Sequence, residues 1–400
     1  MGSAHNTFTG RTSRSGYAPI KAAQGWLDGV EFSSDKPLLD VSQAAPIEPP
    51  PKIMRDAIAD YVLNVPQAHT YGPILGMPKL REQLARHWSE TYGCDVGLDR
   101  VAITSGCNQA FCATISALAD EGDNIILPTP WYFNHKMWLD MAGIKTQPLI
   151  CGSDMLPSPQ NAEQLIGPKT RAICIVSPNN PAGVEYPQSL LDAFYQIAKK
   201  HNIALVLDET YKDFHSNPQN PHLLLQNPNW DETLIQLYSF SKSFRLTGHR
   251  VGAIITSKRR MQEIEKFLDT VAICPSQVGQ FAALWGLENL DDWLSEQRNE
   301  IVLRRRHLQT HFRKIENQGW KLLGSGAYFA YFEHPYEING IELAQLLVRD
   351  EAILCLPGEM FAPQEIQQAN RNLRVAFANI DCPDIESLLN RLSKFRLPLA

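Results

Sequence analysis

The residues with the clearest chemical potential lie in one segment, 239–252. A single lysine, Lys242, stands there between Ser241 and Ser243, and Arg250 follows eight residues later. A lysine that forms an imine with an aldehyde has to lose its proton near neutral pH, and a confined cationic neighbourhood lowers its pKa. An aldehyde that also carries a phosphate needs an arginine and hydroxyl donors nearby. Pyridoxal phosphate needs both, so the segment predicts a site for that cofactor; the alternative is a surface loop with ordinary basic residues.

A carboxylate follows another apolar segment. Residues 205–207 are apolar, Asp208 comes directly after them, and Tyr211 follows three residues later. In open α/β sheets, ligands collect at the carboxyl ends of the strands. A buried aspartate there can keep a pyridine nitrogen protonated, and the tyrosine can reach the ring hydroxyl. Alternatively, Asp208 only caps the next helix.

Two further strand ends carry groups that suit the same cofactor. Asn180 precedes Pro181, which favours an extended conformation that aims the amide at a ring oxygen, unless the pair is a plain turn. Gly106 joins a predicted strand to a helix, where the backbone N–H groups of Cys107 and Asn108 can hold a phosphate. This joint is a weak signal alone, because many such joints bind nothing.

Two more residues are candidates by their type and place. Tyr132 follows the apolar residues 125–127 and can stack on a pyridine ring, although core packing is an equal alternative. Arg374 stands inside the otherwise apolar segment 373–377. A buried guanidinium must be paired, either with a substrate carboxylate or with an internal acid.

Composition limits the class of protein. The chain has 400 residues, is 44% apolar and carries a net charge of −6, with no basic stripe that would indicate a nucleic-acid partner. No apolar run approaches the ~18 residues of a membrane span. The eight cysteines form no CxxC pair and have no histidine at ligand spacing, so we expect reduced thiols, a cytoplasmic protein and no metal site.

The apolar pattern predicts an α/β fold. Six short apolar runs alternate with helical stretches, which indicates a mainly parallel sheet covered by helices on both faces. Segments with mixed strand and helix patterns follow, and they predict a smaller α+β domain. The runs are 101–104, 124–127, 172–176, 204–207, 234–237 and 251–255.

The same pattern gives four parts of the chain. We expect a flexible arm over residues 1–30, the first part of the small domain with a connector over 31–65, and a large cofactor-binding domain over 66–290. Residues 291–400 then form the rest of the small domain, including a long bridging helix. The arm is basic and free of acidic residues up to residue 27, which overlaps with the composition of a transit peptide.

Read in order, these residues resemble the class I/II aminotransferases of the pyridoxal phosphate fold-type I superfamily, from about residue 39 to the C-terminus. The resemblance rests on the cofactor motifs above, on Arg374, and on Tyr71 in a Thr-Tyr-Gly-Pro segment. It implies an aminotransferase with a ping-pong cycle between an amino acid and a 2-oxo acid. A lyase on the same fold, such as a cysteine-conjugate β-lyase, is the alternative, and a non-catalytic pyridoxal phosphate-binding regulator is a more distant one.

The resemblance also implies roles for the individual residues. Lys242 would be the Schiff-base lysine and proton shuttle, Asp208 would pair with the ring nitrogen, and Tyr132 would stack on the ring. Arg374 would hold the substrate α-carboxylate, and a tyrosine like Tyr71 would reach the phosphate of a neighbouring subunit in a homodimer. The remaining cofactor contacts would come from Asn180, Tyr211, Gly106, Cys107, Asn108, Ser239, Ser241 and Arg250.

The substrate side departs from the family pattern. The family usually has a Gly-x-Pro segment near the substrate carboxylate, and this chain has Ala44-Ala45-Pro46 instead. Residues 326–329 also lack the proline expected just before them. Asn180, Ala44 and Tyr17 are the expected substrate contacts, and aromatic residues such as Tyr17 and Tyr132 favour a neutral or aromatic amino donor.

Overall fold

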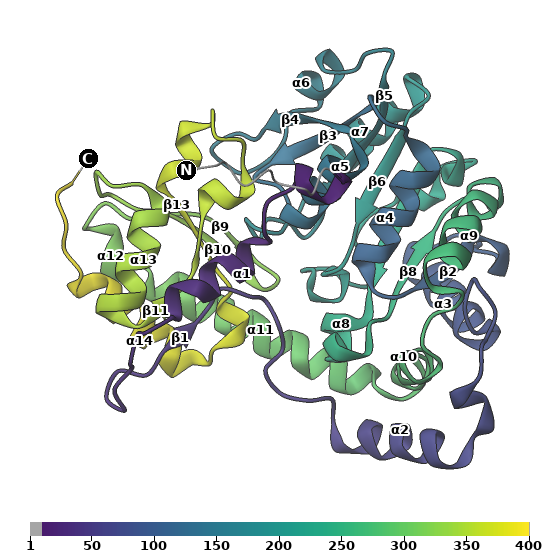
Figure 1. The fold of residues 1–400 in the computed structure, drawn as a ribbon, viewed down its shortest axis with the longest axis horizontal. Helices are drawn as coiled ribbons and strands as arrows, with labels where there is room; N and C mark the ends of the chain where they lie inside the picture. The colour runs from purple at the N-terminus through teal and green to yellow at the C-terminus, as the bar shows by residue number, and fades with distance from the viewer. Residues whose placement is uncertain (1–9, 400) are drawn as a thin grey trace, which may run out of the picture.

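A computed structural model describes residues 10–399 of the chain. It contains a large unit around a seven-stranded sheet and a smaller unit around a four-stranded sheet, which lie side by side (Figure 1). The fold is α/β with a mainly parallel large sheet, so the predicted fold class is confirmed.

The large sheet has the strand order β2-β8-β7-β6-β5-β3-β4. β8 runs antiparallel to both of its neighbours, and the other pairs are parallel. Its strands are β2 (Val101–Thr104), β3 (Asn124–Thr129), β4 (Lys145–Ile150), β5 (Thr170–Val176), β6 (Ala204–Asp208), β7 (Leu234–Ser239) and β8 (Gly252–Ile255).

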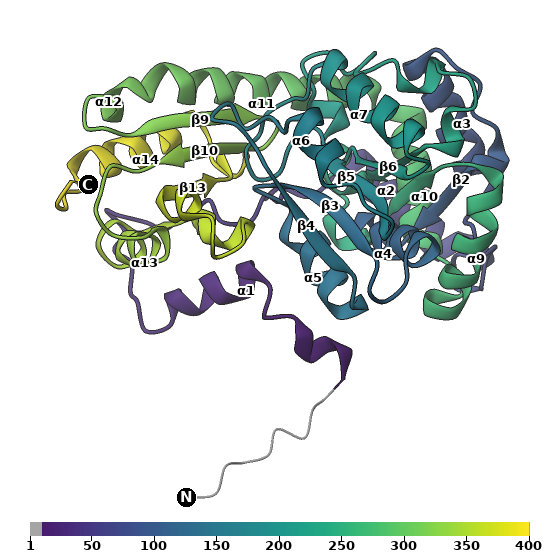
Figure 2. The same cartoon turned by 90° about the horizontal axis from the view of Figure 1, so that it is seen from above.

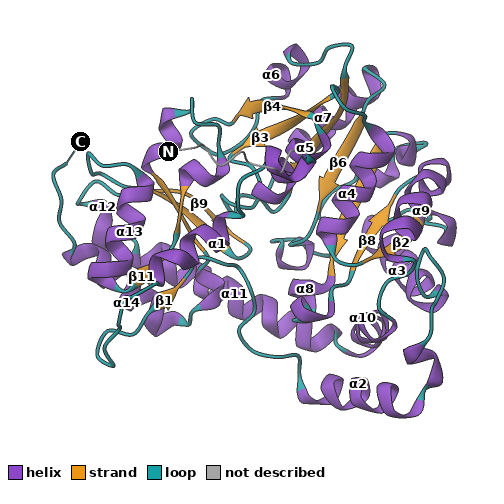
Figure 3. Cartoon of the chain, in the orientation of Figure 1, coloured by secondary structure: helices purple, strands orange, loops and turns teal. Residues whose placement is uncertain are grey.

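Helices cover both faces of this sheet, as Figures 1 and 3 show. Side chains of β6 alternate between the two layers: Leu205 and Leu207 pack into one core, and Ala204 and Val206 into the other. Burial on both faces explains the continuous apolar runs of these strands. The helices of the first layer are α3 (Pro78–Tyr92), α7 (Gln188–Lys200) and α10 (Gln277–Asn289), and those of the second are α4 (Cys107–Leu118), α5 (Phe133–Ala142) and α9 (Lys258–Ala272).

The smaller unit packs helices against an antiparallel sheet of order β12-β13-β10-β9. Leu373 of β13 and Phe332 of β10 pair across this sheet and lie in its core. The strands are β9 (Lys321–Gly326), β10 (Phe329–Glu333), β12 (Leu356–Pro357) and β13 (Asn372–Val375). The helices are α11 (Asp291–His311), α12 (Arg313–Glu316), α13 (Gly340–Glu351) and α14 (Cys382–Lys394).

The helix α11 runs from the large unit along the small one, as Figure 2 shows from above. The sequence predicted a long bridging helix in this part of the chain. In the structure α11 ends at His311 and the short α12 follows after Phe312.

The N-terminal segment has regular structure in the part that is described. The predicted flexible arm covers residues 1–30, of which 1–9 lie outside the described residues. Residues 11–27 form three short helical segments, including α1 (Pro19–Gln24). Ala23 of α1 is fully buried and packs in one cluster with Phe133 and Phe361, so this part of the chain contacts both units.

The connection to the large unit begins with β1 (Leu39–Asp40), which pairs in parallel with β11 (Ile353–Leu354). After a proline-rich stretch, α2 (Lys52–Asn64) packs beside α10. Over residues 10–399, no helix combines the length and apolar character that a membrane crossing needs. All eight cysteines are unpaired.

Candidate active site

A cavity of about 660 Å³ lies at the carboxyl ends of the large sheet's strands, where the small unit meets the large one. Its walls combine strand ends of the large unit with Arg374 and Phe329 of the small unit. Twelve of the fifteen residues predicted for the site line this cavity: Ala44, Cys107, Asn108, Tyr132, Asn180, Asp208, Tyr211, Ser239, Ser241, Lys242, Arg250 and Arg374.

Lys242 lies in a short helix, α8 (Phe240–Ser243), that starts directly after β7. The Ser239 hydroxyl accepts a hydrogen bond from the backbone N–H of Ser241 at 3.2 Å, which caps this helix. The Lys242 ammonium donates to the backbone carbonyl of Ala44. Burial, and then the charges of Arg374 and Arg250, lower the pKa of Lys242 to about 7. A substantial fraction of this amine is therefore neutral and nucleophilic near pH 7.

Asp208 ends β6 with its carboxylate buried. His135 of α5 lies with Nε2 3.2 Å from one carboxylate oxygen, and the backbone N–H of Thr210 donates to the other at 2.9 Å. Burial opposes ionisation of Asp208, but these two partners outweigh it, and the pKa of the carboxyl lies below its ordinary value. The next helical turn begins after Tyr211 without a side-chain cap, so Asp208 does not cap it.

His135 was missed by the sequence analysis. Its imidazole stacks on Phe111 of α4 with ring centroids 3.9 Å apart, and it meets Tyr132 edge-on at 5.0 Å. The ring is fixed between these aromatic side chains with one nitrogen on Asp208. Its position three residues after Tyr132, at the start of a helix, was the available signal.

Another part of the cavity wall has the composition of an anion site. Gly106 has φ +89° and precedes α4, and a Cβ on it would lie 2.3 Å from Nη2 of Arg250. Only glycine therefore lets this guanidinium lie over the start of the helix. Arg250 also donates to the carbonyl of Thr247 at 2.9 Å. Together with the hydroxyl groups of Ser239 and Ser241, this donor set suits a phosphate.

Arg374 lies in β13 and is only 2% exposed. Its guanidinium carbon is 4.9 Å from the ring centroids of both Phe329 and Phe361. Nη1 donates to the Asn180 side-chain oxygen at 3.0 Å and Nη2 to the Ser42 carbonyl, whereas the buried Nε has no hydrogen-bond partner.

No carboxylate within residues 10–399 forms an ion pair with Arg374, so an internal acid does not neutralise it. Burial lowers the pKa of this guanidinium to about 10. A buried cation without an internal counter-ion, facing a cavity, favours an anionic ligand such as a carboxylate.

Two tyrosines complete the wall. The Tyr132 hydroxyl lies 3.3 Å from the Asn108 side-chain oxygen and accepts from Asn134 at 2.9 Å. Tyr211 packs against Phe329 with ring centroids 5.3 Å apart. Burial raises the pKa of Tyr132 to about 12 and raises that of Tyr211 well above its usual value, so both hydroxyls stay protonated and can donate.

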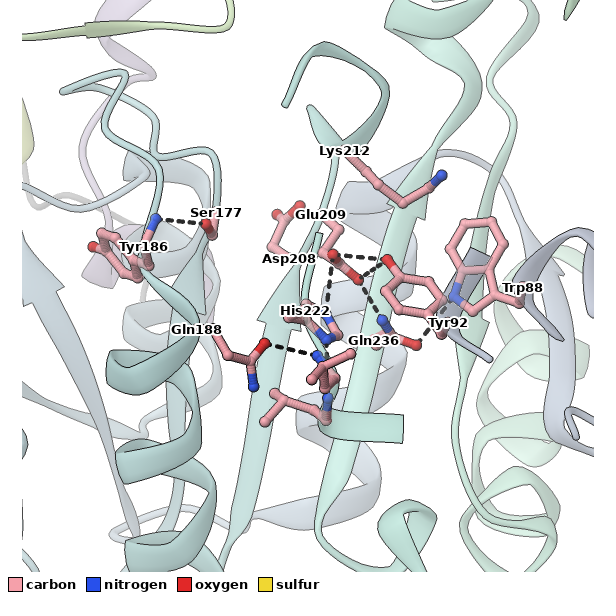
Figure 4. Close-up of polar contacts among 12 residues, drawn as sticks. Trp88, Tyr92, Ser177, Tyr186, Gln188, Asp208, Glu209, Lys212, His222 and Gln236 are labelled. Carbon is pink, nitrogen blue, oxygen red and sulfur yellow. Dashed lines mark hydrogen bonds and ion pairs between the residues drawn. The ribbon is translucent and has the colours of Figure 1, made fainter. Parts of the chain in front are cut away.

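A polar network lies behind Asp208, on the other face of the sheet, and Figure 4 shows it. Glu209 is buried there and accepts from the Tyr92 hydroxyl at 2.9 Å and from Gln236. His222 Nε2 lies 3.2 Å from the same carboxylate, and Trp88 donates to Gln236 at 3.0 Å. This network, which the sequence analysis also missed, fixes the chain next to Asp208.

Three predicted site residues do not line the cavity. Gly106 lies just behind the wall, as described above. Tyr71 and Tyr17 have 80% and 79% of their surface exposed. Ala18 and Ile20 contribute to the cavity in place of Tyr17, whose ring instead lies under the Lys21 ammonium at 4.6 Å.

The fold and this cavity define an enzyme of the fold-type I class. The family model described as aminotransferase class I and II matches residues 28–392, so the chain belongs to the class I and II aminotransferase family. It is an aminotransferase, as the sequence predicted.

Named relatives agree with this assignment. The chain is 28% identical over 292 residues to an aspartate aminotransferase of Thermotoga maritima, covering 72% of this chain and 74% of that protein. It is 27% identical over 320 residues to an aromatic aminotransferase of Arabidopsis thaliana, covering 77% and 78% of the two chains.

Solved structures share the fold. A Thermus thermophilus aspartate aminotransferase mutant superposes with a TM-score of 0.86 at 22% identity, covering 97% of this chain and 99% of that one. A protein from Escherichia coli described as having a methionine aminotransferase function gives the same TM-score at 20% identity, with the same coverage. At these identities the likeness concerns the fold.

Proposed function

We propose that the cavity binds pyridoxal 5′-phosphate and that the enzyme moves an amino group between an amino acid and a 2-oxo acid in a ping-pong cycle. The carrying observation is that Lys242, with its pKa lowered to about 7, shares one cavity with an ionised buried Asp208 and an uncompensated Arg374. When bound, the cofactor supplies an aldehyde for amines and a protonated ring that withdraws electrons from the reacting carbon.

The residues present fit this group. Arg250, Ser239, Ser241 and the amides at the start of α4 form the phosphate end, because Gly106 leaves room for the guanidinium. Asp208, held by His135, would pair with the ring nitrogen, and Asn180 and Tyr211 would hold the ring oxygen. Tyr132 would stack on the ring. We assign these roles as proposals from the residue types and their shared cavity.

Lys242 and Arg374 act on the substrate. Arg374 forms a bidentate pair with the α-carboxylate and thereby orients the amino acid. The Lys242 amine would act as the base that takes the proton from the substrate Cα. Asn180 has a double role, because its side-chain oxygen already holds Nη1 of Arg374 at 3.0 Å.

The donor is proposed to be a neutral or aromatic amino acid. The cationic side chains lining the cavity over the described residues are Lys242, Arg250 and Arg374, and each has a role above. Among the described residues, the cavity wall therefore holds no additional cation that could bind the side-chain carboxylate of an acidic amino acid such as aspartate. Ala18, Ile20 and Phe133 instead give an apolar surface.

The test is amino transfer measured by the 2-oxo acid formed from each of twenty amino acids. We expect neutral and aromatic donors to exceed aspartate and glutamate, and Lys242→Ala to abolish the reaction. Release of ammonia and pyruvate from cysteine conjugates without a 2-oxo acceptor would instead favour the lyase. The family match and the named relatives favour transfer.

We also propose a homodimer in which Tyr71 reaches the phosphate of the partner's site. Tyr71 is 80% exposed, and the N–H of the next residue, Gly72, donates to Cys274 Sγ at 3.4 Å. Tyr71 therefore lies beside the exposed Ile273, and Leu63 at the end of α2 is 80% exposed as well. A second subunit covering this surface would bury these side chains.

The proposed domain boundaries remain those of the sequence analysis. Residues 66–290 include the large sheet, and residues 31–65 with 291–400 include β1 and the small sheet. We propose a cytoplasmic location, which is consistent with eight unpaired cysteines.

A further inference from the structure

Two histidines and a glutamate converge between two helices of the small unit, remote from the proposed chemistry. His307 and His311 lie one turn apart on α11, and their ring centroids are 4.1 Å apart. Glu386 reaches them from α14, which packs along α11. None of the three lines the cavity that contains Lys242. No metal site was expected from the sequence, and the His-x-x-x-His spacing of His307 and His311 is the signal that could have indicated one.

The distances are those of ligands around one small cation. Glu386 Oε1 lies 3.1 Å from His307 Nε2 and 3.7 Å from His311 Nε2, and one ligand atom from each residue lies within 4.8 Å of the others. Bonds of about 2.0–2.1 Å in a tetrahedral zinc site place neighbouring ligand atoms roughly 3.3 Å apart. The two measured distances bracket this value.

A backbone contact orients the His311 ring. Its Nδ1 lies 2.9 Å from the carbonyl oxygen of His307, and a carbonyl can only accept, so Nδ1 carries the proton. Nε2 is then the ring nitrogen that faces Glu386, 3.7 Å from Oε1. Such a bond from the second nitrogen to a carbonyl is a common feature of metal-binding histidines.

His307 points to the same place. Its Nε2 is buried and makes no hydrogen bond, although the Glu386 oxygen is only 3.1 Å away. A metal ion between the two atoms would bind the nitrogen lone pair and the carboxylate oxygen together.

We propose that His307, His311 and Glu386 form a binding site for a divalent transition metal, with zinc as the best fit to two imidazoles and one carboxylate. Water supplies the remaining ligand at this partly exposed position. The bound ion links α11 to α14 and so stabilises the small unit. Lys314 lies 4.0 Å from the second Glu386 oxygen and donates to Asn390 at 3.1 Å, so its charge weakens the site without occupying it.

The test measures zinc binding to the cofactor-loaded enzyme after chelator treatment, by equilibrium dialysis and by thermal unfolding with and without zinc. We expect zinc to raise the Tm of the wild type. His311→Ala and Glu386→Gln should each lose this increase and bind zinc at least about tenfold more weakly. His201→Ala is the matched control, because His201 also pairs with a glutamate, Glu163, at 2.9 Å but has no second histidine.

Two further measurements distinguish zinc binding at this site from zinc binding elsewhere on the enzyme. Lys314→Gln should bind zinc more tightly than the wild type, since it removes the neighbouring positive charge. Transaminase activity without added metal should be the same in the wild type and His311→Ala. The proposal is overturned if His311→Ala and Glu386→Gln retain the zinc affinity and Tm increase of the wild type and of His201→Ala, because zinc then binds elsewhere.

Discussion

At the residue scale, the site depends on three buried ionisable groups whose charge states differ. Lys242 loses most of its preference for the charged form, Asp208 keeps its charge, and Arg374 keeps its charge without an acidic partner. All three groups are buried, and the difference follows from what each one meets there. Burial, and then the charges of Arg374 and Arg250, lower the pKa of Lys242. His135 and the N–H of Thr210 keep Asp208 ionised despite its burial, and aromatic rings flank Arg374.

The His135–Asp208 contact gives a pH-dependent prediction. Asp208 has a lowered pKa in the folded protein, so it contributes stability above its ordinary value of 3.8, and this contribution is lost as the pH falls through the folded pKa. His135→Phe retains the stacking on Phe111 but removes Nε2, and burial then raises the pKa of Asp208 instead. The variant should therefore lose more Tm relative to the wild type at pH 7 than at pH 4.

The control for this prediction is the double variant with Asp208→Asn. Without an ionisable group at position 208, the effect of His135→Phe on Tm should become much less dependent on pH. If the Tm difference between wild type and His135→Phe is the same at both pH values, His135 does not determine the ionisation of Asp208.

Arg374 gives a prediction that separates binding from stability. Arg374→Ala should raise KM for both amino and oxo acids, corresponding to roughly 2–4 kcal/mol of lost binding for a buried carboxylate pair. Arg374→Lys should recover only part, because an ammonium cannot form two parallel bonds. Arg374→Ala also removes the hydrogen bonds to Asn180 and to the Ser42 carbonyl, so some loss of Tm is expected as well and KM is the quantity that reports the carboxylate pair. A large loss of Tm with an unchanged KM would mean that Arg374 only supports the fold.

At the element scale, the strands that are apolar on both faces were the ones that the sequence predicted, including β5, β6 and β7. β4 was missed because it lies at the edge of the sheet, contains Pro148 and exposes residues such as Lys145 and Ile150. β9 was missed for a related reason, since its residues are mostly half-buried and include glycines.

The candidate site was predictable where a polar residue ends an apolar strand, as Asp208 ends β6. His135 and Glu209 were not, since their roles depend on contacts between elements far apart in the sequence. His135 comes from α5, and Glu209 meets Tyr92 and Gln236 of two other elements. Long-range packing of this kind leaves no pattern along the chain.

The joint between β2 and α4 gives the prediction at this scale. Gly106→Ala combines an unfavourable φ of +89° with a Cβ 2.3 Å from the Arg250 guanidinium. Arg250 must move, so the variant should bind pyridoxal 5′-phosphate at least about tenfold more weakly, measured by titration of the cofactor absorbance. Gly167→Ala, with no atom within 4 Å of the new Cβ, is the control and should bind normally. Equal affinities would show that this joint does not hold the phosphate.

At the scale of the whole molecule, the cavity lies where the two units meet, so Arg374 of the small unit faces strand ends of the large one. Tyr71 and Leu63, each 80% exposed, belong to the surface that we propose contacts a second subunit. A dimer of this kind makes the two sites depend on each other's chains.

A hybrid dimer tests that dependence. Lys242→Ala and Tyr71→Ala subunits should each be impaired as homodimers. In a mixed dimer, one of the two sites combines an intact Lys242 with an intact Tyr71 from the partner, so mixing should restore activity. Stable hybrids, verified by differential tagging, that remain as inactive as their parents would show that each site is built within one chain.

The central claim is that Lys242 is the residue that carries pyridoxal 5′-phosphate. Reduction of the enzyme with borohydride in the presence of the cofactor, followed by peptide mass spectrometry, tests it most directly, because reduction makes an imine between a lysine and the cofactor permanent. The account predicts that the cofactor mass appears on the peptide containing Lys242 and is absent in Lys242→Ala. The cofactor mass on a different lysine of the wild type, with Lys242 unmodified, would contradict it.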